Sequence, residues 1–224
     1  GENLVVSGYD FTKFPIGTRF TCKDVVLELT QIGKECHHGC EIFQKMGECI
    51  MPTNGVFAKV LHGGKISVGD EFHVQYRAAV ITLSDTASKG EREDASGAAV
   101  EEIVGKEGYE VVLKKIIPDD GDTLTALLCE LSDEDKADLI LTTGGTGFSK
   151  RDNTPEATMR AVERETPGIS EAMRYYSLQI TPRAMLSRGV SGIRKEALIV
   201  NLPGSPKAVR ECLEYAIGAL THGI

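Results

Sequence analysis

Short apolar runs alternate with helical patterns from about residue 78 to the end of the chain. Four runs have the length of buried strands, and they cover residues 78–83, 109–117, 138–142 and 197–201. Apolar residues at helical spacing predict one helix over 95–105 and another, capped by Asp122-Thr123, that runs through Leu131. Alternation of strands and helices is typical of a parallel sheet with helices on both faces. We therefore predict an α/β domain with three layers, αβα, built on a mostly parallel sheet.

The first 76 residues follow a different pattern. Segments 18–30 and 66–75 are strand-like, with Gly69-Asp70 as a turn between short runs. The stretch 33–47 between them is rich in Cys, His and Gly. We therefore expect a small, mostly β module at residues 1–76, followed by the α/β domain at residues 77–224.

Composition and charge exclude some classes of protein. The chain has 224 residues, of which 41% are hydrophobic, and this is typical of a globular protein. No apolar run approaches the roughly 18 residues that a membrane-spanning helix needs, so we expect no membrane span. The net charge of -8 argues against a general nucleic-acid-binding protein.

The charge is unevenly distributed along the chain. Residues 77–135 carry 6 basic and 15 acidic side chains, whereas residues 136–210 carry 12 basic and 7 acidic ones. A basic stretch within an acidic protein suggests a site for a small anion. Helix faces that are solvated and happen to differ in sign explain the same pattern, and on charge alone this is the simpler explanation.

The segment from Thr142 to Gly147 gives the strongest functional signal. It directly follows a predicted strand and holds three glycines in four positions, which lets the backbone approach a ligand and offer N–H groups to an anion. Ligands of open α/β sheets bind at the carboxyl ends of the strands. Thr154-Pro155 then predicts a helix start, with Thr154 as N-cap and Pro155 at the first helical position. The candidate binding residues of this loop are Thr143, Gly144, Gly145, Thr146 and Gly147.

Carboxylates follow the same strand ends. Asp119 comes after the strand that ends at Ile117, and Asp152 follows the glycine segment. Two carboxylates at one sheet edge are able to hold a Mg²⁺ ion that bridges phosphate oxygens. Ser84 and Asp85, after the first strand, belong to the same candidate edge, although ordinary turn chemistry explains that pair equally well.

A third loop repeats the arrangement of strand, tight turn and helix. Pro203, Gly204 and Ser205 follow the last predicted strand, and their N–H groups and hydroxyl are candidates to bind a phosphate or a pterin. The alternative is a structural loop without a ligand. Basic candidates for anion contacts elsewhere are Arg183, Arg188 and Arg194.

Together these motifs resemble one family, the molybdopterin adenylyltransferases of molybdenum-cofactor biosynthesis (MogA/MoaB type). The resemblance runs from about residue 77 to residue 222, and the motifs occur in the order that the family has them. They are Ser84-Asp85-x-Ala87-Ser88-x-Gly90, Ile117-Pro118-Asp119, Thr142 to Gly147 with Arg151-Asp152-x-Thr154-Pro155-Glu156-Ala157, Glu165-Thr166-Pro167-Gly168, Ile180-Thr181-Pro182, Leu186-Ser187-Arg188, and Asn201-Leu202-Pro203-Gly204-x-Pro206.

The resemblance implies a reaction and its residues. ATP and molybdopterin would be the substrates, and the products would be adenylylated molybdopterin and pyrophosphate. Asp119 and Asp152 would be the two essential carboxylates and the Mg²⁺ ligands, while the glycine loop, Ser84, Asp85, Arg188 and residues 203–205 would line the substrate cleft. The family also implies a homotrimer, a cytoplasmic location and other molybdenum-cofactor biosynthesis proteins as partners. A protein that binds or carries molybdopterin without catalysis is the alternative function.

The N-terminal module resembles the trailing half of a MOSC domain over residues 27–72. The resemblance rests on Ile32-Gly33-Lys34-Glu35-Cys36-His37 and on Phe57-Ala58-Lys59-Val60-Leu61 through Gly69-Asp70. MOSC domains use a cysteine to hold the molybdenum cofactor or to carry sulfur, and Cys36 or Cys40 would be that residue here. Alternatively, Cys36, Cys40 and Cys49 bind Zn²⁺ together with histidine, or are plain reduced thiols of a cytoplasmic protein.

Overall fold

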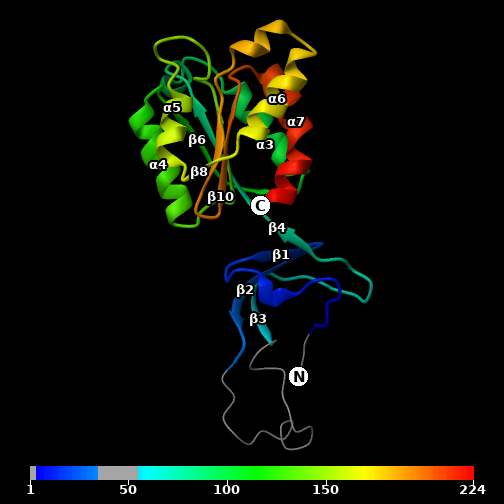
Figure 1. The fold of residues 1–224 in the computed structure, drawn as a ribbon. Coiled ribbons are helices and arrows are strands. Elements are labelled where there is room, and N and C mark those ends of the chain that lie inside the picture. Colours follow the sequence, from blue (N-terminus) through cyan, green and yellow to red (C-terminus); the bar gives the residue numbers. More distant parts are fainter. Residues whose placement is uncertain (1–3, 35–54) are drawn as a thin grey trace, which may run out of the picture. The chain divides into compact units, whose positions relative to one another are not determined.

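The computed structural model describes residues 4–34 and 55–224, which form parts of two compact units. The first unit spans Gly1–Gln75 and the second spans Tyr76–Ile224 (Figure 1). Cys36 and Cys40, our candidates for a MOSC cysteine, lie outside the described residues. Each unit is described by itself below.

The N-terminal unit is built on an antiparallel sheet with the strand order β3-β2-β1-β4. The strands are β1 (Arg19–Cys22), β2 (Val25–Ile32), β3 (Val56–His62) and β4 (His73–Gln75), and a short 3₁₀ helix, η1 (Phe11–Lys13), precedes them. Phe20, which is 3% exposed, packs edge-on against Phe11 and Phe14. An aromatic cluster on one face of the sheet is therefore the core of this unit.

The C-terminal unit is an α/β fold around a six-stranded sheet with the order β6-β5-β7-β10-β9-β8. Strands β6, β5, β7 and β10 are parallel, and β9 and β8 extend the sheet in antiparallel fashion. The strands are β5 (Arg77–Leu83), β6 (Glu110–Ile117), β7 (Leu139–Thr143), β8 (Arg164–Glu165), β9 (Ser191–Arg194) and β10 (Ala197–Leu202). The helices are η2 (Ala87–Lys89), α3 (Ala95–Lys106), α4 (Gly121–Asp133), α5 (Thr154–Ala161), α6 (Pro167–Leu178), η3 (Pro182–Leu186) and α7 (Pro206–Gly223).

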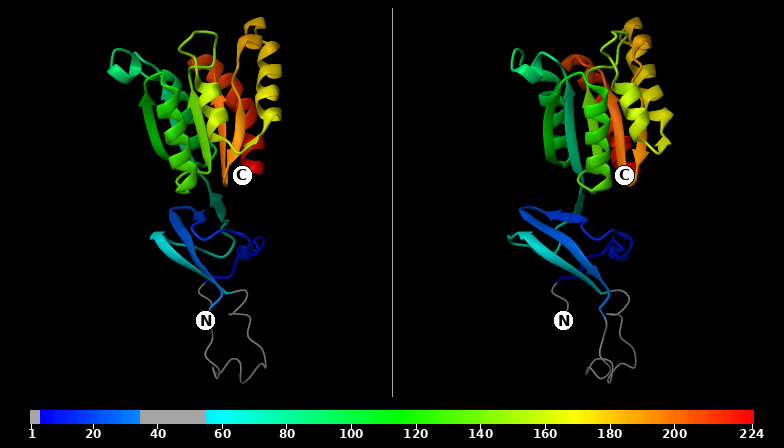
Figure 2. Two further views of the ribbon diagram at one scale, coloured as in Figure 1. Left: turned by 60° about the vertical axis from the view of Figure 1, so that its left-hand side comes forward. Right: turned by 90° about the vertical axis from the view of Figure 1, so that its left-hand side faces the viewer.

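Helices cover both faces of this sheet, so the unit has the three layers that the sequence predicts (Figure 2). Along β5, Ala78 and Val80 face the layer formed by α3, α6 and α7, whereas Ala79 and Ile81 face α4 and α5. All four side chains are fully buried. This two-sided burial explains why the central strands are apolar at every position and show no polar alternation.

Two helix starts differ from the sequence prediction by one or two residues. Asp120, and not Asp122, is the N-cap of α4, because its carboxylate accepts hydrogen bonds from the N–H of Asp122 and the hydroxyl of Thr123. Helix α5 begins at Thr154, with Asn153 at the N-cap position, so the hydroxyl of Thr154 is free for another partner. No helix within residues 4–34 and 55–224 combines the length and the hydrophobicity needed to cross a membrane.

The order of the strands places a topological switch point between β5 and β7. From β5 the chain passes through α3 to β6 on one side, and from β6 it returns through α4 to β7 on the other side of β5. Helices α3 and α4 pack on opposite faces of the sheet. Open α/β sheets bind ligands at such switch points, so the carboxyl ends of β5 and β7 are where a ligand is expected.

Asn201 ties the centre of the sheet to helix α5. It is 2% exposed, and its Nδ2 donates hydrogen bonds of 2.9 Å to the hydroxyls of both Thr142 and Thr158, while its Oδ1 accepts from the N–H of Val190 at 3.2 Å. Buried polar groups are costly when they lose their partners. This network therefore fixes β10, β7, α5 and the segment before β9 relative to one another.

We expect Asn201→Ala to lower the free energy of unfolding by about 2–4 kcal/mol, because three polar partners lose their bond inside the core. Thr158→Val removes only one bond of the network and should cost about 1 kcal/mol. Urea unfolding followed by far-ultraviolet circular dichroism measures both, since every α-helix in the described residues belongs to the C-terminal unit. Equal effects of the two variants would contradict the network.

Candidate active site

The glycine loop after β7 lies directly against the end of β5. Gly144 has a φ of +100°, and a Cβ atom at this position would lie 2.4 Å from the backbone oxygen of Leu83. Gly145, with a φ of +63°, is equally tight, because its Cβ would lie 2.4 Å from the hydroxyl oxygen of Thr154. A Cβ at Gly204, in the loop after β10, would lie 3.2 Å from the Gly144 Cα. Glycine is therefore required where these three chain segments meet.

Hydrogen bonds hold this loop in place from both sides. The hydroxyl of Thr154 donates to the Gly144 oxygen at 2.9 Å, and the N–H of Thr154 donates to the Gly145 oxygen at 3.1 Å. The hydroxyl of Thr143 donates to the Pro203 oxygen at 2.7 Å. The first turn of α5 thus fixes the loop, which is a different role from the N-cap that the sequence predicted for Thr154.

The loop keeps three successive N–H groups without protein partners. The N–H groups of Gly145, Thr146 and Gly147 donate no hydrogen bond to any residue in the described part of the chain. Thr146 is only 7% exposed, so its backbone is shielded from bulk water. Unpaired N–H groups in a shielded glycine loop are the ordinary arrangement for binding an anionic oxygen.

Two carboxylates face each other beside this loop. The N–H of Asp85 donates to Asp119 Oδ2 at 3.0 Å, and the N–H of Asp119 donates to Asp85 Oδ1 at 3.1 Å. Arg151 binds the same Asp85 carboxylate through Nε at 3.1 Å and through its terminal nitrogen at 2.7 Å. The loops after β5 and β6 and the segment before α5 therefore meet at one place, at the switch point.

Electrostatics distinguish these two carboxylates. The Arg151 guanidinium holds the pKa of Asp85 below its ordinary value. Burial raises the pKa of Asp119, and the charges of Asp85 and Asp152 act in the same direction, against hydrogen bonding from Asp85 and the charge of Arg151. Asp85 and Asp152 therefore both act on Asp119, and Arg151 offsets part of this negative charge.

Asp152 is held in position by its own turn and by Arg188. Its Oδ2 accepts a hydrogen bond of 2.8 Å from the N–H of Ser149, and its backbone oxygen accepts from the Arg188 guanidinium. Arg188 also donates to the backbone oxygen of Gly147 at 2.7 Å and pairs with Glu156. The Arg188 side chain is thus engaged in three internal contacts that join the glycine loop to α5.

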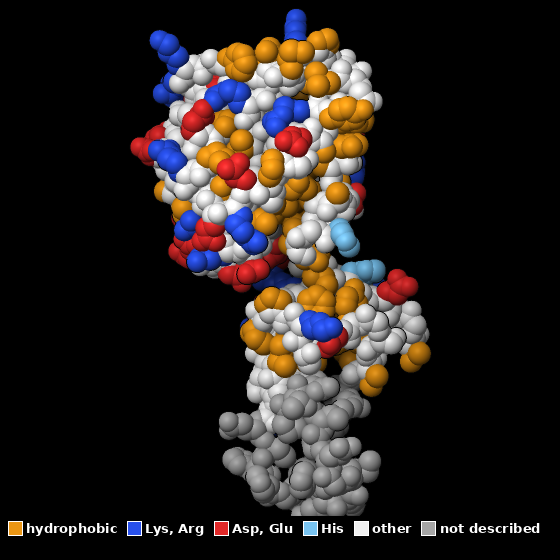
Figure 3. All heavy atoms as spheres, in the orientation of Figure 1, with side chains coloured by type: hydrophobic (Ala, Val, Ile, Leu, Met, Phe, Trp, Pro, Cys, Tyr) orange, Lys and Arg blue, Asp and Glu red, His pale blue; other side chains and the backbone are white. Residues whose placement is uncertain are grey.

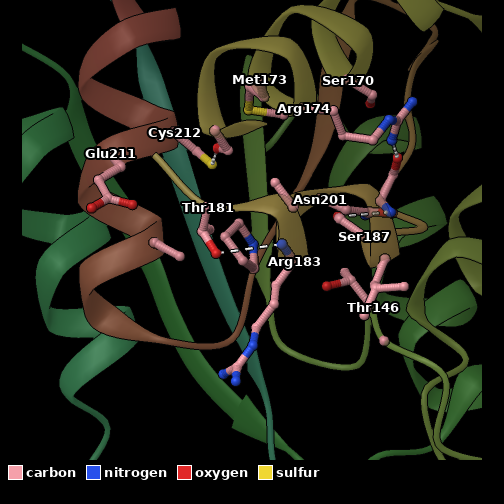
Figure 4. A pocket seen from close by; sticks show the side chains of 17 residues that line it. Thr146, Ser170, Met173, Arg174, Thr181, Arg183, Ser187, Asn201, Glu211 and Cys212 are labelled. Atoms are coloured by element: carbon pink, nitrogen blue, oxygen red, sulfur yellow. Dashed lines mark hydrogen bonds between the residues drawn. The ribbon is translucent and has the colours of Figure 1, made fainter. Parts of the chain in front are cut away.

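A pocket of about 290 Å³ lies beside the glycine loop (Figure 4). Its lining combines the polar groups of Thr146, Ser170, Arg174, Thr181 and Ser187 with the apolar groups of Met173, Leu186, Pro203 and Cys212. Arg183 is at the rim, and its guanidinium has no hydrogen-bond or ion-pair partner among the described residues. Leu178, at the end of α6, and Met185, in η3, are exposed apolar side chains. Hydrophobic side chains gather at one end of the C-terminal unit in Figure 3.

A smaller pocket of about 110 Å³ lies on the other side of the glycine loop, against the start of α3. Ser84, Thr143, Gly144 and Gly204 line it, together with Asp94. The Asp94 carboxylate is the N-cap of α3 and accepts a bond of 2.8 Å from the N–H of Gly97. The glycine loop therefore contributes to two pockets, and several residues that line each of them are candidates from the sequence.

The structure brings most of the sequence-derived candidates to one edge of the sheet. These candidates lie at or after the carboxyl ends of parallel strands, and they are Ser84, Asp85, Asp119, Asp152, the loop Thr143–Gly147, Pro203, Gly204 and Ser205. Ser205 is the N-cap of α7, where its hydroxyl accepts from the N–H of Ala208 at 3.2 Å. Arg194 does not belong to this edge, because it pairs with Ala197 at the start of β10 and binds Asp133.

Sequence reasoning assigned no role to Arg151 and did not find the larger pocket. Arg151 follows the glycine loop by a few residues and directly precedes the candidate carboxylate Asp152. This position was the one feature of the sequence that could have indicated a role for Arg151. Met173, Ser177 and Cys212 read as ordinary residues of amphipathic helices, and only the packing of α6 on α7 turns them toward a cavity. No group of three His, Cys, Asp or Glu side chains in residues 4–34 and 55–224 has the arrangement of a metal site.

Comparison with known proteins gives consistent matches to both units. Residues 79–222 match the family described as "Probable molybdopterin binding domain", and residues 1–73 match the MOSC domain. The chain is 44% identical over 149 residues to a molybdopterin adenylyltransferase of Helicobacter pylori, with 64% of this chain and 82% of that protein covered. The enzyme of the same name from Escherichia coli is 44% identical over 155 residues, which cover 66% and 79% of the two chains.

Solved structures show the same fold. The molybdopterin biosynthesis enzyme MoaB of Thermus thermophilus superposes with a TM-score of 0.63 at 44% identity, and covers 66% of this chain and 94% of its own. The tungsten cofactor synthesizing protein MoaB of Pyrococcus furiosus gives a TM-score of 0.61 at 35% identity. The MogA/MoaB-like fold that the motifs predicted for the C-terminal unit is therefore confirmed, with an additional small antiparallel sheet at the N-terminus.

We expect Gly144→Ala to destabilise the C-terminal unit by about 2 kcal/mol or more, because a Cβ would overlap the Leu83 oxygen and the positive φ disfavours alanine. Gly168→Ala is the matched control, since Gly168 lies in α6, has open space around it and no positive φ. That change should be neutral or stabilise by up to about 1 kcal/mol. A thermal midpoint of the Gly144 variant equal to that of the control would refute the close approach.

The raised pKa of Asp119 predicts a pH-dependent cost in stability. The folded state binds this proton more tightly than the unfolded state, so stability is lost as the pH rises through the raised pKa. Asp119→Asn keeps an oxygen that can accept the Asp85 N–H, and it should therefore unfold at higher urea than wild type at neutral pH. This advantage should vanish below the ordinary pKa of aspartate, about 3.9. A variant that is less stable than wild type at neutral pH would show that burial does not disfavour the charge.

Proposed function

The chain belongs to the family of probable molybdopterin binding domains, and on that premise we propose that it acts in molybdenum cofactor biosynthesis as a molybdopterin adenylyltransferase. An oxygen of the terminal phosphate of molybdopterin would attack the α-phosphate of ATP. The bond between the α-phosphate and the bridging oxygen of the β-phosphate would break, and pyrophosphate would leave. We assign this activity to residues 77–224 and cofactor or sulfur handling to the MOSC-like module at 1–76.

One observation carries the proposal: three unpaired N–H groups lie between a ligand-sized pocket and a cluster of carboxylates. Transfer of an adenylyl group needs positioned phosphates and neutralised charge, and little covalent chemistry from the protein. The N–H groups of Gly145, Thr146 and Gly147 supply fixed donors for phosphate oxygens. The carboxylates supply ligands for the counterion of those phosphates.

We place the pterin end of the substrate in the 290 Å³ pocket. Its mixture of apolar walls and hydroxyl groups suits a flat heterocycle with polar edges. The unpartnered guanidinium of Arg183 at the rim is available for an anionic group of the substrate. The terminal phosphate of the pterin would then reach the glycine loop, because Thr146 and Gly147 belong to both the pocket and the loop.

We propose that two carboxylates at this edge hold a Mg²⁺ ion. Asp119 and Asp152 both lie against the glycine loop, because a Cβ at Gly145 would lie 3.7 Å from Asp119 Oδ1 and one at Gly147 would lie 2.9 Å from Asp152 Oδ2. Mg²⁺ at phosphate-transfer sites takes one or two carboxylates, with waters and substrate phosphates as its other ligands. Asp119 and Asp152 would hold the ion, which when bound neutralises charge on the phosphate oxygens.

The remaining candidates support this arrangement. We propose that a substrate at the switch point lies beside Ser84, Gly144 and Gly204, because these residues line the smaller pocket. The N–H of Asp85 would orient the Asp119 carboxylate that it binds. The internal contacts of Arg188 and Ser205 assign them to positioning of the loops. We extend to this chain the homotrimer of its family and its cooperation with other cofactor-biosynthesis proteins, and the need for ATP favours the cytoplasm.

We expect purified protein to release pyrophosphate when it is given ATP, Mg²⁺ and molybdopterin. Asp119→Asn and Asp152→Asn should each reduce turnover by at least about a hundredfold, since each removes charge at the site of phosphate neutralisation. A coupled assay for pyrophosphate measures this, and circular dichroism checks that both variants fold.

Cys36→Ser and Cys40→Ser are the controls for the same assay, and adenylylation should proceed in both at the wild-type rate. Near-wild-type turnover of Asp152→Asn would discard the metal assignment. Binding of molybdopterin without pyrophosphate release, and without any need for ATP, would instead support a carrier protein.

A further inference from the structure

We propose that Arg151 exchanges partners during the reaction: it pairs with Asp85 in the empty site and with a phosphate of the bound nucleotide once a divalent cation occupies the carboxylates. The inference rests on the proposed function for the identity of the ligand, a polyphosphate with its cation. It concerns a residue to which neither the sequence motifs nor the family match assigns a role.

Arg151 lies where a bound cation would otherwise neutralise the Asp85 carboxylate. Its guanidinium makes three contacts of 2.7–3.1 Å with Asp85, and it also interacts with the charges of Asp119 and Asp120. Within the described residues, Asp85 is the one carboxylate to which the Arg151 side chain hydrogen-bonds. The guanidinium thus neutralises part of the charge that a divalent cation would neutralise in the loaded site.

The pair is accessible to solvent. The Arg151 side chain is 61% exposed and that of Asp85 is 38% exposed, so water screens part of the attraction between the bidentate partners and a ligand can reach the guanidinium. Arg188, by contrast, binds the backbone oxygens of Gly147 and Asp152 and the Glu156 carboxylate on α5. The hydrogen bonds of the Arg151 side chain therefore go to one partner, Asp85, and that partner is exposed.

Charge balance supplies the driving force for the exchange. A divalent cation near Asp119 repels a guanidinium held at the neighbouring Asp85. A polyphosphate that arrives with the cation offers paired oxygens, which match the planar guanidinium at least as well as a carboxylate does. The charges of Arg151 and Asp152 both act on the Asp119 carboxylate, so the Arg151 guanidinium lies close to a carboxylate that would hold the cation.

The test begins with cation binding to the nucleotide-free protein. Mn²⁺ is the probe, and its free concentration is measured by electron paramagnetic resonance. Arg151→Gln removes the competing charge but keeps a hydrogen-bonding side chain, and it should bind Mn²⁺ about two- to fivefold more tightly than wild type. The same variant should bind pyrophosphate, in the presence of Mg²⁺, about tenfold more weakly by calorimetry, because the released guanidinium is missing.

Arg160→Gln is the matched control. Arg160 is 53% exposed, lies on α5 and pairs with Asp122 at 2.9 Å, so it has the same kind of exposed partner but hydrogen-bonds to none of Asp85, Asp119 and Asp152. This variant should change neither affinity. An equal change in both variants would overturn the proposal and reduce it to an effect of net charge.

A double-mutant cycle with Asp85→Asn distinguishes exchange from a general field effect. In the Asp85→Asn background, Arg151 has lost its charged partner. Arg151→Gln should then change the Mn²⁺ affinity by less than half as much as it does in wild type. An undiminished change, or an unchanged pyrophosphate affinity, would overturn the exchange. These readouts need no molybdopterin, so they remain decisive if adenylyl transfer itself is not observed.

Discussion

The contact between Gly144 and the end of β5 is the constraint on which the site depends. A Cβ at this position would lie 2.4 Å from the Leu83 oxygen, so the loop after β7 is as close to the neighbouring strand as a polypeptide allows. This closeness brings the free N–H groups of Gly145–Gly147 next to Asp85 and Asp119. A side chain at Gly144 would overlap the Leu83 oxygen, so the loop or the strand end would have to move.

Much of the fold follows from the sequence because its central strands are buried on both faces. Val80 and Ile81 are adjacent, fully buried and packed against different helices, and this is why an uninterrupted apolar run predicts a parallel sheet. The exact ends of the helices were less predictable. Asp120 and Asp122 are both good N-caps by residue type, and only the path of the chain after β6 decides between them.

Some residues of the candidate site could be predicted from the sequence, whereas others depend on contacts between distant parts of the chain. Residues at strand ends, such as Asp119 and Gly144, are visible in the sequence because the sheet brings every carboxyl end to one edge. The pairing of Arg151 with Asp85 joins positions 66 residues apart and depends on side-chain rotamers that no local pattern encodes. The pocket against α7 likewise depends on how two helices pack, and Cys212 there resembles any other core residue.

Arg188 has a consequence for how the two halves of the site respond to each other. One guanidinium binds the backbone of Gly147, which lines the larger pocket, and the backbone of Asp152, whose carboxylate belongs to the acidic edge. A ligand that displaces the glycine loop must therefore displace Asp152 as well. Any effect that a ligand in the pocket has on the acidic edge through this guanidinium would be reciprocal, so a ligand at the acidic edge would change the affinity of the pocket by the same factor.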